Sequence, residues 1–118
     1  MAAMKLYNWD TVAAEQLNAD VNRKVIHGQN LTVGRFELRK GGAVPEHSHV
    51  NEQVTMVVSG ALKFVFPDRE QVVRAGDSLV IAPHEPHRVD VLEDTVVVDV
   101  FSPPREDWIT GNDAYLRR

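Results

Sequence analysis

Residues 41–60 read GGAVPEHSHVNEQVTMVVSG, and the expectations for the rest of the chain start from this stretch. His47 and His49 are separated by one residue, and Gln53 follows four positions later. Side chains of an extended strand alternate between two faces, so these three residues share a face if the chain stays extended. Imidazoles at this spacing can converge on one ion, and an amide oxygen can join them. The stretch therefore predicts part of a metal site, and a second histidine cluster within residues 75–89 can supply the missing ligand.

Short strands are predicted on both sides of this stretch, because apolar residues recur with a period of two and turn residues separate the segments. About eight or nine strands are expected. Most of them lie at residues 21–27, 31–38, 54–58, 61–66, 71–74, 78–81, 87–92 and 95–101. Residues 61–66 are expected to pair with residues 54–58 across the turn at Ser59 and Gly60. The pattern indicates an antiparallel sandwich or a closed barrel.

The two ends of the chain differ from its strand-rich middle. A short helix is predicted over residues 11–17, with Asp10 or Thr11 as its N-cap. Residues 102–118 start with a proline pair and are expected to end in short helical turns. We expect residues 1–118 to form one domain, an all-β fold with a short helical appendage at each end.

The composition is typical of a soluble globular protein and argues against several classes of function. Of the 118 residues, 43% are hydrophobic and 25% are charged. The net charge is −4 and no basic run is present, so binding to nucleic acid or to an anionic membrane is not expected. The chain has no cysteine, so a metal would be held by nitrogen and oxygen ligands. No signal peptide or membrane span is evident, and a cytoplasmic protein is expected.

The histidine stretch resembles the first motif of the cupin family, G-x5-H-x-H-x3-E-x6-G. Gly41, His47, His49 and Gly60 occupy its fixed positions at the same spacing, and Gln53 replaces the glutamate. The resemblance implies the double-stranded β-helix, or jelly-roll barrel, that cupins adopt.

The second cupin motif, G-x5-P-x-G-x2-H-x3-N, is matched in part. Gly76 and His87 keep their spacing, whereas Ala82, His84 and Val91 stand where a proline, a glycine and an asparagine are usual. The two motifs together imply that one divalent transition metal is bound inside the barrel. The implied ligands are His47, His49, Gln53 and His87. Nickel, zinc, iron, manganese and copper all bind such nitrogen and oxygen sites, so the identity of the metal stays open.

The ligand set has a consequence for charge. Three neutral imidazoles and a neutral amide leave the +2 charge uncompensated, so the ion would attract an anionic or hydroxyl-bearing ligand. The alternative is that the histidines only satisfy hydrogen bonds, which would be costly in an apolar barrel. His84 is either a substrate contact or a solvated loop residue, and His27 is expected to be a satisfied or surface histidine.

The predicted strand at residues 95–101, TVVVDVF, places Asp99 and Phe101 on one face. An aspartate in such a strand has two explanations. It is either an outward or edge carboxylate paired with a lysine or arginine, or a carboxyl inside the barrel with a raised pKa, ready for proton transfer. Arg105 follows a stiff proline pair and is expected to bind a substrate carboxylate through two hydrogen bonds.

Residues 99–108, DVFSPPREDW, resemble the tail of the small cupins that act in pectin and alginate breakdown, which convert ring-form 4,5-unsaturated uronates to linear keto acids. The resemblance implies that Asp99 is the acid or base, that Arg105 positions the substrate carboxylate and that Phe101 shapes the pocket. It also implies a metal-dependent isomerase, a small anionic sugar acid as substrate and a homodimer. Two other functions stay open: a cupin dioxygenase or related oxidoreductase with a three-histidine site, and a non-catalytic cupin that binds a small sugar.

Overall fold

The computed structural model describes residues 3–118, which form ten strands and two short helices. The larger sheet contains β1 (Glu15–Asn18), β2 (Val21–His27), β3 (Thr32–Leu38), β5 (Glu52–Ser59), β8 (Ser78–Ile81) and β10 (Thr95–Ser102). The smaller sheet contains β4 (Ala43–His47), β6 (Ala61–Val65), β7 (Glu70–Arg74) and β9 (His87–Val91). The helices are α1 (Glu106–Ile109) and the 3-10 helix η1 (Ala114–Arg117).

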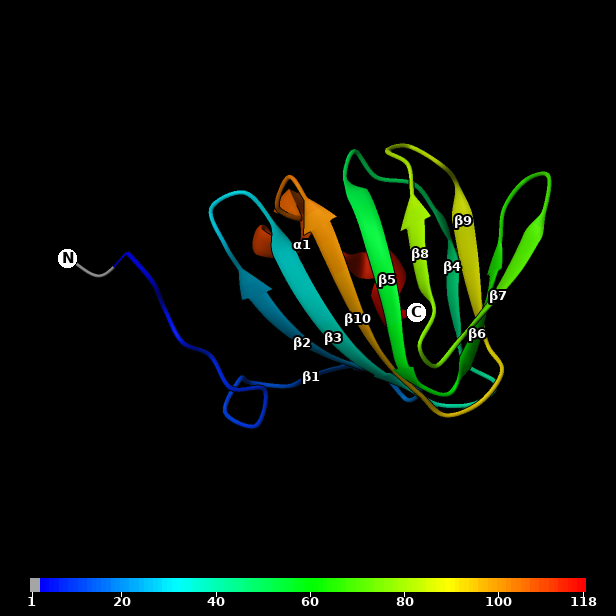
Figure 1. Cartoon of the computed structure of the whole chain (residues 1–118), viewed down its shortest axis with the longest axis horizontal. Helices are drawn as coiled ribbons and strands as arrows, with labels where there is room; N and C mark the ends of the chain where they lie inside the picture. The colour runs from blue at the N-terminus through cyan, green and yellow to red at the C-terminus, as the bar shows by residue number, and fades with distance from the viewer. Residues whose placement is uncertain (1–2) are drawn as a thin grey trace.

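Two antiparallel sheets face each other as an open barrel (Figure 1). The strand order is β1-β2-β3-β10-β5-β8 in the larger sheet and β4-β9-β6-β7 in the smaller sheet. β10 lies between β3 and β5, so strands far apart in the sequence are neighbours, as in jelly-roll folds. The predicted all-β barrel is confirmed.

The alternation of apolar residues places one face of each sheet on a shared core. β10 buries Val97 and Phe101, and β6 buries Leu62 and Phe64, with less buried residues between them. Other members of the core are Leu17, Val21, Phe36, Leu38, Val57, Phe66, Val73, Ile81, Val89, Val91, Trp108 and Leu116. The core therefore draws on both sheets and on the C-terminal segment.

The turn at Gly60 takes the chain from the larger sheet to the smaller one. Gly60 has a φ of +92°, and a side chain there would collide with Asp94 and Thr95. β6 pairs with β7 and β9, so the predicted pairing of residues 61–66 with residues 54–58 is wrong. The turn is a corner between two sheets, because each of the two strands finds its hydrogen-bond partners in its own sheet.

The N-terminal segment has strand structure where a helix was predicted. The backbone N–H groups of Thr11 and Val12 both donate to the carbonyl of Asn8, which forms a single turn that does not continue. β1 then pairs with β2 through the ladder partners Glu15 and Arg23. The helix predicted over residues 11–17 is therefore wrong, because pairing with a neighbouring strand satisfies the backbone of β1 instead.

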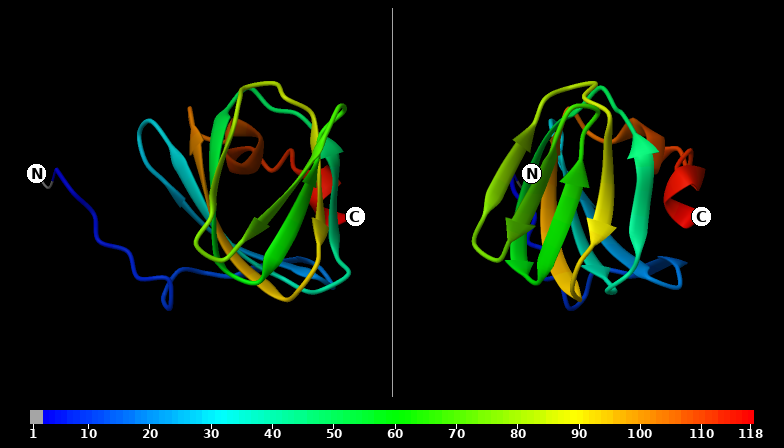
Figure 2. Two further views of the ribbon diagram at one scale, coloured as in Figure 1. Left: turned by 45° about the vertical axis from the view of Figure 1, so that its right-hand side comes forward. Right: turned by 90° about the vertical axis from the view of Figure 1, so that its right-hand side faces the viewer.

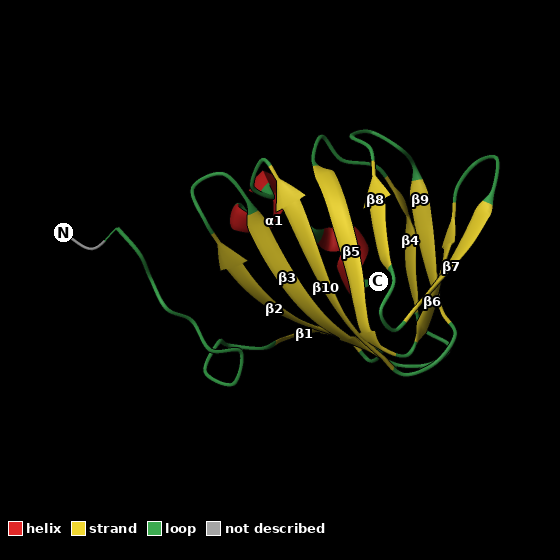
Figure 3. Ribbon diagram, in the orientation of Figure 1, coloured by secondary structure: helices red, strands yellow, loops and turns green. Residues whose placement is uncertain are grey.

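The C-terminal segment closes the side of the barrel where the two sheets do not meet. Figure 2 shows α1 and η1 between the sheets, and η1 contacts both β1 and β4. The side-chain amide of Asn18 donates to the carbonyls of Leu116 (3.2 Å) and Arg118 (3.0 Å). Figure 3 shows that helical structure is confined to this segment, as predicted for the C-terminus. Neither helix within residues 3–118 has the length and apolar character required to traverse a membrane.

Candidate metal centre and active site

Three histidines from two strands and a loop meet inside the barrel. His47 ends β4 and lies directly opposite His87, the first residue of β9. His49 lies in the following loop, and the candidate ligand nitrogens of the three residues are within 4.8 Å of one another. The chain does not stay extended from His47 to Gln53, because β4 ends and β5 starts in the other sheet. The shared-strand argument is therefore wrong, although the histidines do converge.

Each of the three imidazoles is held by a backbone carbonyl two residues away. The Nδ1 distances are 2.8 Å from His47 to Pro45 O, 3.0 Å from His49 to Asn51 O and 2.8 Å from His87 to Glu85 O. A carbonyl can only accept, so Nδ1 carries the proton and Nε2 presents a lone pair. Burial lowers the pKa of His47 and of His49 to about 4 and also lowers the pKa of His87. The imidazoles are therefore neutral at pH 7, as metal ligands must be.

The amide of Gln53 completes the fit to a cation. Its nitrogen donates to Thr55 Oγ1 (2.9 Å), and the Thr55 hydroxyl donates to Asp99 Oδ1 (2.7 Å). The amide oxygen is consequently turned toward His49, with 3.0 Å between Oε1 and Nε2. Both atoms are acceptors and cannot bond to each other. A shared cation satisfies both, because metal–ligand bonds of about 2.1 Å at right angles separate two ligand atoms by about 3 Å. The residues present therefore fit a divalent metal.

Asp99 faces the interior of the barrel. It lies opposite Gly34 on β3 and Thr55 on β5, and it lines the same cavity as Gln53. It forms no ion pair with any residue in the described part of the chain, so the explanation as an outward, paired carboxylate is wrong. Burial raises the pKa of Asp99 to about 6, although hydrogen bonds from Thr55 and Gln53 act in the opposite direction.

Arg105 is buried between two aromatic rings. Its guanidinium carbon lies 4.7 Å from the centre of the Phe101 ring and 4.3 Å from that of Trp108. Nε and Nη2 donate to the carboxylate of Asp107 at 2.9 and 2.7 Å, and Nη2 also donates to the hydroxyl of Tyr115 at 2.5 Å. The guanidinium edge formed by Nε and Nη2 is thus held by Asp107. A ligand would have to approach Arg105 from the side of Nη1.

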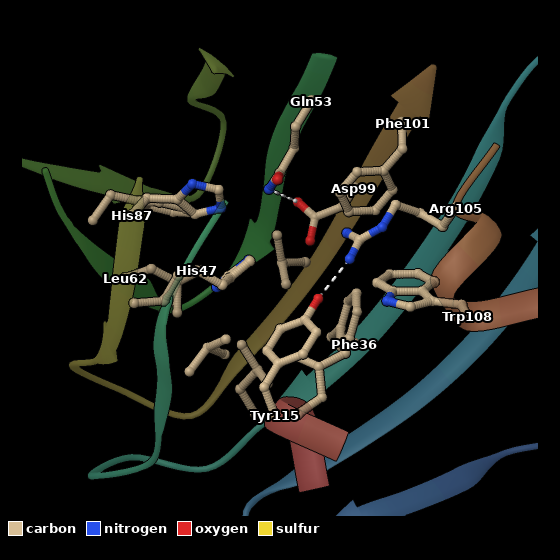
Figure 4. A pocket seen from close by; sticks show the side chains of 16 residues that line it. Phe36, His47, Gln53, Leu62, His87, Asp99, Phe101, Arg105, Trp108 and Tyr115 are labelled. Carbon is tan, nitrogen blue, oxygen red and sulfur yellow. Dashed lines mark hydrogen bonds between the residues drawn. The ribbon is translucent and has the colours of Figure 1, made fainter. Parts of the chain in front are cut away.

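The cavity between the histidines and Arg105 contains about 470 Å³ of empty space, part of which is open to solvent. Figure 4 shows that its wall combines the predicted residues other than His49 with aromatic side chains from the C-terminal segment. Its polar and aromatic lining consists of Phe36, His47, Gln53, Phe64, His87, Asp99, Phe101, Arg105, Trp108 and Tyr115. Gly34 makes room for this wall, because a Cβ there would lie 2.9 Å from the Phe36 ring and 3.2 Å from that of Trp108.

Six polar or aromatic residues around this cavity were not predicted to act there: Phe36, Thr55, Phe64, Asp107, Trp108 and Tyr115. Asp107 and Trp108 occur in the DVFSPPREDW stretch, and an acid two residues after Arg105 is a signal for the pair. Nothing in the local pattern indicates Tyr115, which reaches the cavity only because η1 folds back onto β1 and β4.

The two remaining histidines lie outside the three-histidine cluster. His27 is exposed, and its Nδ1 lies 2.8 Å from the Thr32 hydroxyl, which confirms the prediction of a satisfied surface histidine. His84 is also exposed, and its backbone N–H donates to the carbonyl of His49 at 2.8 Å. The backbone of His84 therefore supports the loop that contains the candidate ligand His49.

Comparisons with known proteins agree with this architecture. The family profile described as a cupin domain matches residues 34–101. The chain is 28% identical over 103 residues to the pectin degradation protein KdgF of Dickeya dadantii, an alignment that covers 85% of this chain and 94% of that protein. Its structure resembles that of KdgF from Halomonas sp., with a TM-score of 0.81, 26% identity and coverage of 88% of this chain and 99% of that one. An RmlC-like cupin from Shewanella frigidimarina gives a TM-score of 0.82, 25% identity and coverage of 90% and 96%. The matched profile spans more than half of the residues of this chain, and the chain therefore belongs to the cupin family.

Proposed function

We propose that this chain is a metal-dependent enzyme that opens the ring of 4,5-unsaturated uronates and converts them to linear keto acids. One observation carries the proposal: a partly buried carboxyl, Asp99, shares a cavity with a buried arginine and with two histidines of the neutral three-histidine cluster. The similarity to two KdgF proteins supports a role in the breakdown of pectin or alginate. The substrate would be a small anionic sugar acid.

The reaction is an isomerisation, so no atom is gained or lost. The hydroxyl of the ring hemiacetal loses its proton, the bond between C1 and the ring oxygen breaks, and C1 becomes an aldehyde. The ring oxygen stays on C5 as an enol oxygen, C4 takes up a proton, and C5 becomes a ketone. The three histidines and Gln53 would hold a divalent metal, which would supply positive charge for an oxygen that becomes negative.

The side chains of this chain have separate roles in the scheme. Asp99 takes the proton from the hemiacetal hydroxyl and delivers a proton to C4. Arg105 holds the substrate carboxylate and so fixes the distance from C4 to Asp99. Phe101 packs against the Arg105 guanidinium and limits the access of water to the cavity. No oxidant takes part, which separates this function from that of a dioxygenase.

The test follows the conjugated alkene of an unsaturated galacturonate monomer by its ultraviolet absorbance. We expect the protein to remove this absorbance faster than the spontaneous reaction, to lose the effect on treatment with a chelator and to work equally well without oxygen. His47→Gln is expected to abolish the effect, and His27→Gln, a change at an exposed histidine outside the cluster, to leave it unchanged. A rate equal to the spontaneous one, or a requirement for oxygen, would reject the proposal.

A further inference from the structure

The hydroxyl of Tyr115 has a proton that no neighbouring residue accepts. The ring lies 4.9 Å from that of His47, and the hydroxyl oxygen accepts a hydrogen bond from Arg105 Nη2 (Figure 4). Arginine has no acceptor, so the tyrosine proton is not used in this bond. The pKa of a phenol is ordinarily about 10, so the hydroxyl keeps its proton at neutral pH. Within residues 3–118 this proton has no acceptor.

Two further donors in the same wall lack a partner. Arg105 uses Nε and Nη2 for Asp107 and Tyr115, and its Nη1 has no hydrogen-bond partner in the described part of the chain. The indole Nε1 of Trp108 is buried, and it faces the Tyr115 hydroxyl without a hydrogen bond of normal geometry. We call these three groups, Arg105 Nη1, the Tyr115 hydroxyl and Trp108 Nε1, the donor edge.

Within residues 3–118, no carboxylate accepts a hydrogen bond from Arg105 Nη1, the Tyr115 hydroxyl or Trp108 Nε1. Among the described residues, Asp99 is the one carboxylate that lines the cavity, and the hydrogen bonds that it accepts come from Thr55 and Gln53, at Oδ1. The charge of Asp107 is matched by the two hydrogen bonds it receives from Arg105. A buried donor without an acceptor, such as Trp108 Nε1, is costly, and donors that face a cavity are free to bind a ligand. A carboxylate offers two oxygens that accept several hydrogen bonds. The chemistry of the donor edge thus matches a ligand carboxylate.

The position of Tyr115 is built into the fold. Asp113, two residues before it, is buried and receives hydrogen bonds from Arg23 (2.8 Å) and Arg117 (3.2 Å). Leu116, one residue after it, is buried in the core. These anchors hold η1 against the barrel, so the hydroxyl of Tyr115 is preorganised beside Arg105.

We propose that Tyr115 and Nη1 of Arg105, with Trp108 beside them, form a carboxylate subsite, and that the hydroxyl of Tyr115 donates to one oxygen of a sugar-acid carboxylate. The inference rests on the proposed function for the class of ligand and adds a residue that sets specificity for the acid over the neutral sugar. The other end of such a ligand lies toward the histidines, across the same cavity.

The test compares the binding of D-galacturonate and D-galactose by calorimetry to zinc-loaded protein. We expect the wild-type protein to prefer the acid, and Tyr115→Phe to weaken acid binding about tenfold while the weaker binding of galactose stays unchanged. Tyr7→Phe is a matched control, because Tyr7 is the other tyrosine of the chain and is exposed on the N-terminal segment. It is expected to change neither affinity. Unfolding temperature and zinc content establish that the variants are intact.

A second measurement needs no variant. The chain has two tryptophans, so the indole N–H signal of Trp108 should shift in the NMR spectrum on addition of D-galacturonate while that of Trp9 stays in place.

The outcomes separate this inference from the proposed reaction. Equal affinity of the wild-type protein for both sugars, or undiminished acid binding by Tyr115→Phe, overturns the subsite. An equal loss of affinity for the acid and for galactose also overturns the subsite, because such a loss means that Tyr115 has only a structural role. If acid binding depends on Tyr115 but the unsaturated uronate is not consumed, the subsite stands and the proposed reaction is rejected.

Discussion

The orientation of the Gln53 amide depends on Asp99, a residue of another strand. Thr55 transmits this dependence, because its hydroxyl accepts from the amide nitrogen and donates to the Asp99 carboxylate. If the Gln53 amide were rotated by 180°, its oxygen would face the Asp99 carboxylate and its nitrogen, which cannot bind a metal, would face His49. A single carboxylate therefore both orients a candidate metal ligand and borders the substrate cavity.

The two contributions of Asp99 can be separated by Asp99→Asn. The new amide oxygen can still accept from Thr55, so we expect the metal content to stay the same. The amide cannot take up and release a proton, so the rate of uronate consumption should fall at least about 100-fold. The measurements are initial rates and elemental analysis, with Asp90→Asn on β9, at the surface and paired with Arg88, as the unchanged control. Full activity of Asp99→Asn would contradict the assigned role.

The link between β2 and η1 is a buried network of ion pairs. Arg23 Nη2 lies 2.8 Å from Asp113 Oδ2, and each of the two side chains is only 2% exposed. Arg23 also lies over the ring of Trp108, with 4.6 Å from its guanidinium carbon to the ring centre. Nε and Nη1 of Arg23 have no partner within residues 3–118, and Nη2 contacts Glu15 (3.2 Å) as well as Asp113. Asp113 is the buried one of the two carboxylates. The wall that carries Tyr115 is held in place by the pair of Arg23 and Asp113.

Asp113→Asn is expected to lower the free energy of unfolding by about 3 kcal/mol at pH 7. The buried guanidinium of Arg23 loses its buried carboxylate and keeps only the half-exposed Glu15 as an ion-pair partner. Burial acts to raise the pKa of Asp113, but hydrogen bonds from Arg117 and Arg23 outweigh it and the pKa is lowered. The stability from the carboxylate is thus present above the unfolded-state pKa of about 3.9 and is lost as the pH falls through the lower, folded-state pKa.

The free energy of unfolding of the wild-type protein should therefore approach that of Asp113→Asn as the pH falls below about 4. Urea unfolding at pH 7 and pH 3 measures it. Asp68→Asn, at an exposed residue paired with Arg69, is expected to have little effect at either pH. A difference of the same size at both pH values would show that the charge of Asp113 is not what stabilises the segment.

Two groups of exposed apolar side chains bear on how the whole molecule assembles. Residues 3–14 leave the barrel as an arm (Figures 1 and 2), on which Met4 is 85% and Leu6 99% exposed. On the outer face of the larger sheet, Val58 of β5 is 60% and Val80 of β8 64% exposed. Apolar surface of this kind is typical of an interface between copies of a chain.

We therefore propose a homodimer in which the arm of each copy covers the larger sheet of its partner. Light scattering after size-exclusion chromatography should give the mass of two chains. Combined Met4→Ser and Leu6→Ser substitutions should lower the measured mass toward that of one chain, because the apolar contact of the arm is lost. Ile109→Ser changes an exposed residue of α1 and should not alter the mass. A monomeric wild-type protein rejects the dimer, and a dimer that persists without Met4 and Leu6 rejects the role of the arm.

Local patterns in the sequence predict the strands and much of the cavity lining. The alternation of TVVVDVF places Val97, Asp99 and Phe101 inside, because a strand with one buried face has a period of two. The glycines of the first motif likewise mark corners, as Gly60 shows by its positive φ. These features depend on residues close together in the chain, so they can be read without the fold.

Contacts between distant segments account for what the sequence alone misses. His47 and Gln53 belong to different sheets, the residues predicted as an N-terminal helix pair with β2 instead, and Tyr115 reaches Arg105 only through the return of η1. Each of these outcomes depends on which partner satisfies a backbone or a buried charge, and those partners are far away in the chain. The amino-acid pattern thus specifies which faces are apolar and which residues can bind a metal, whereas packing and hydrogen bonding across the two sheets determine which of those residues meet.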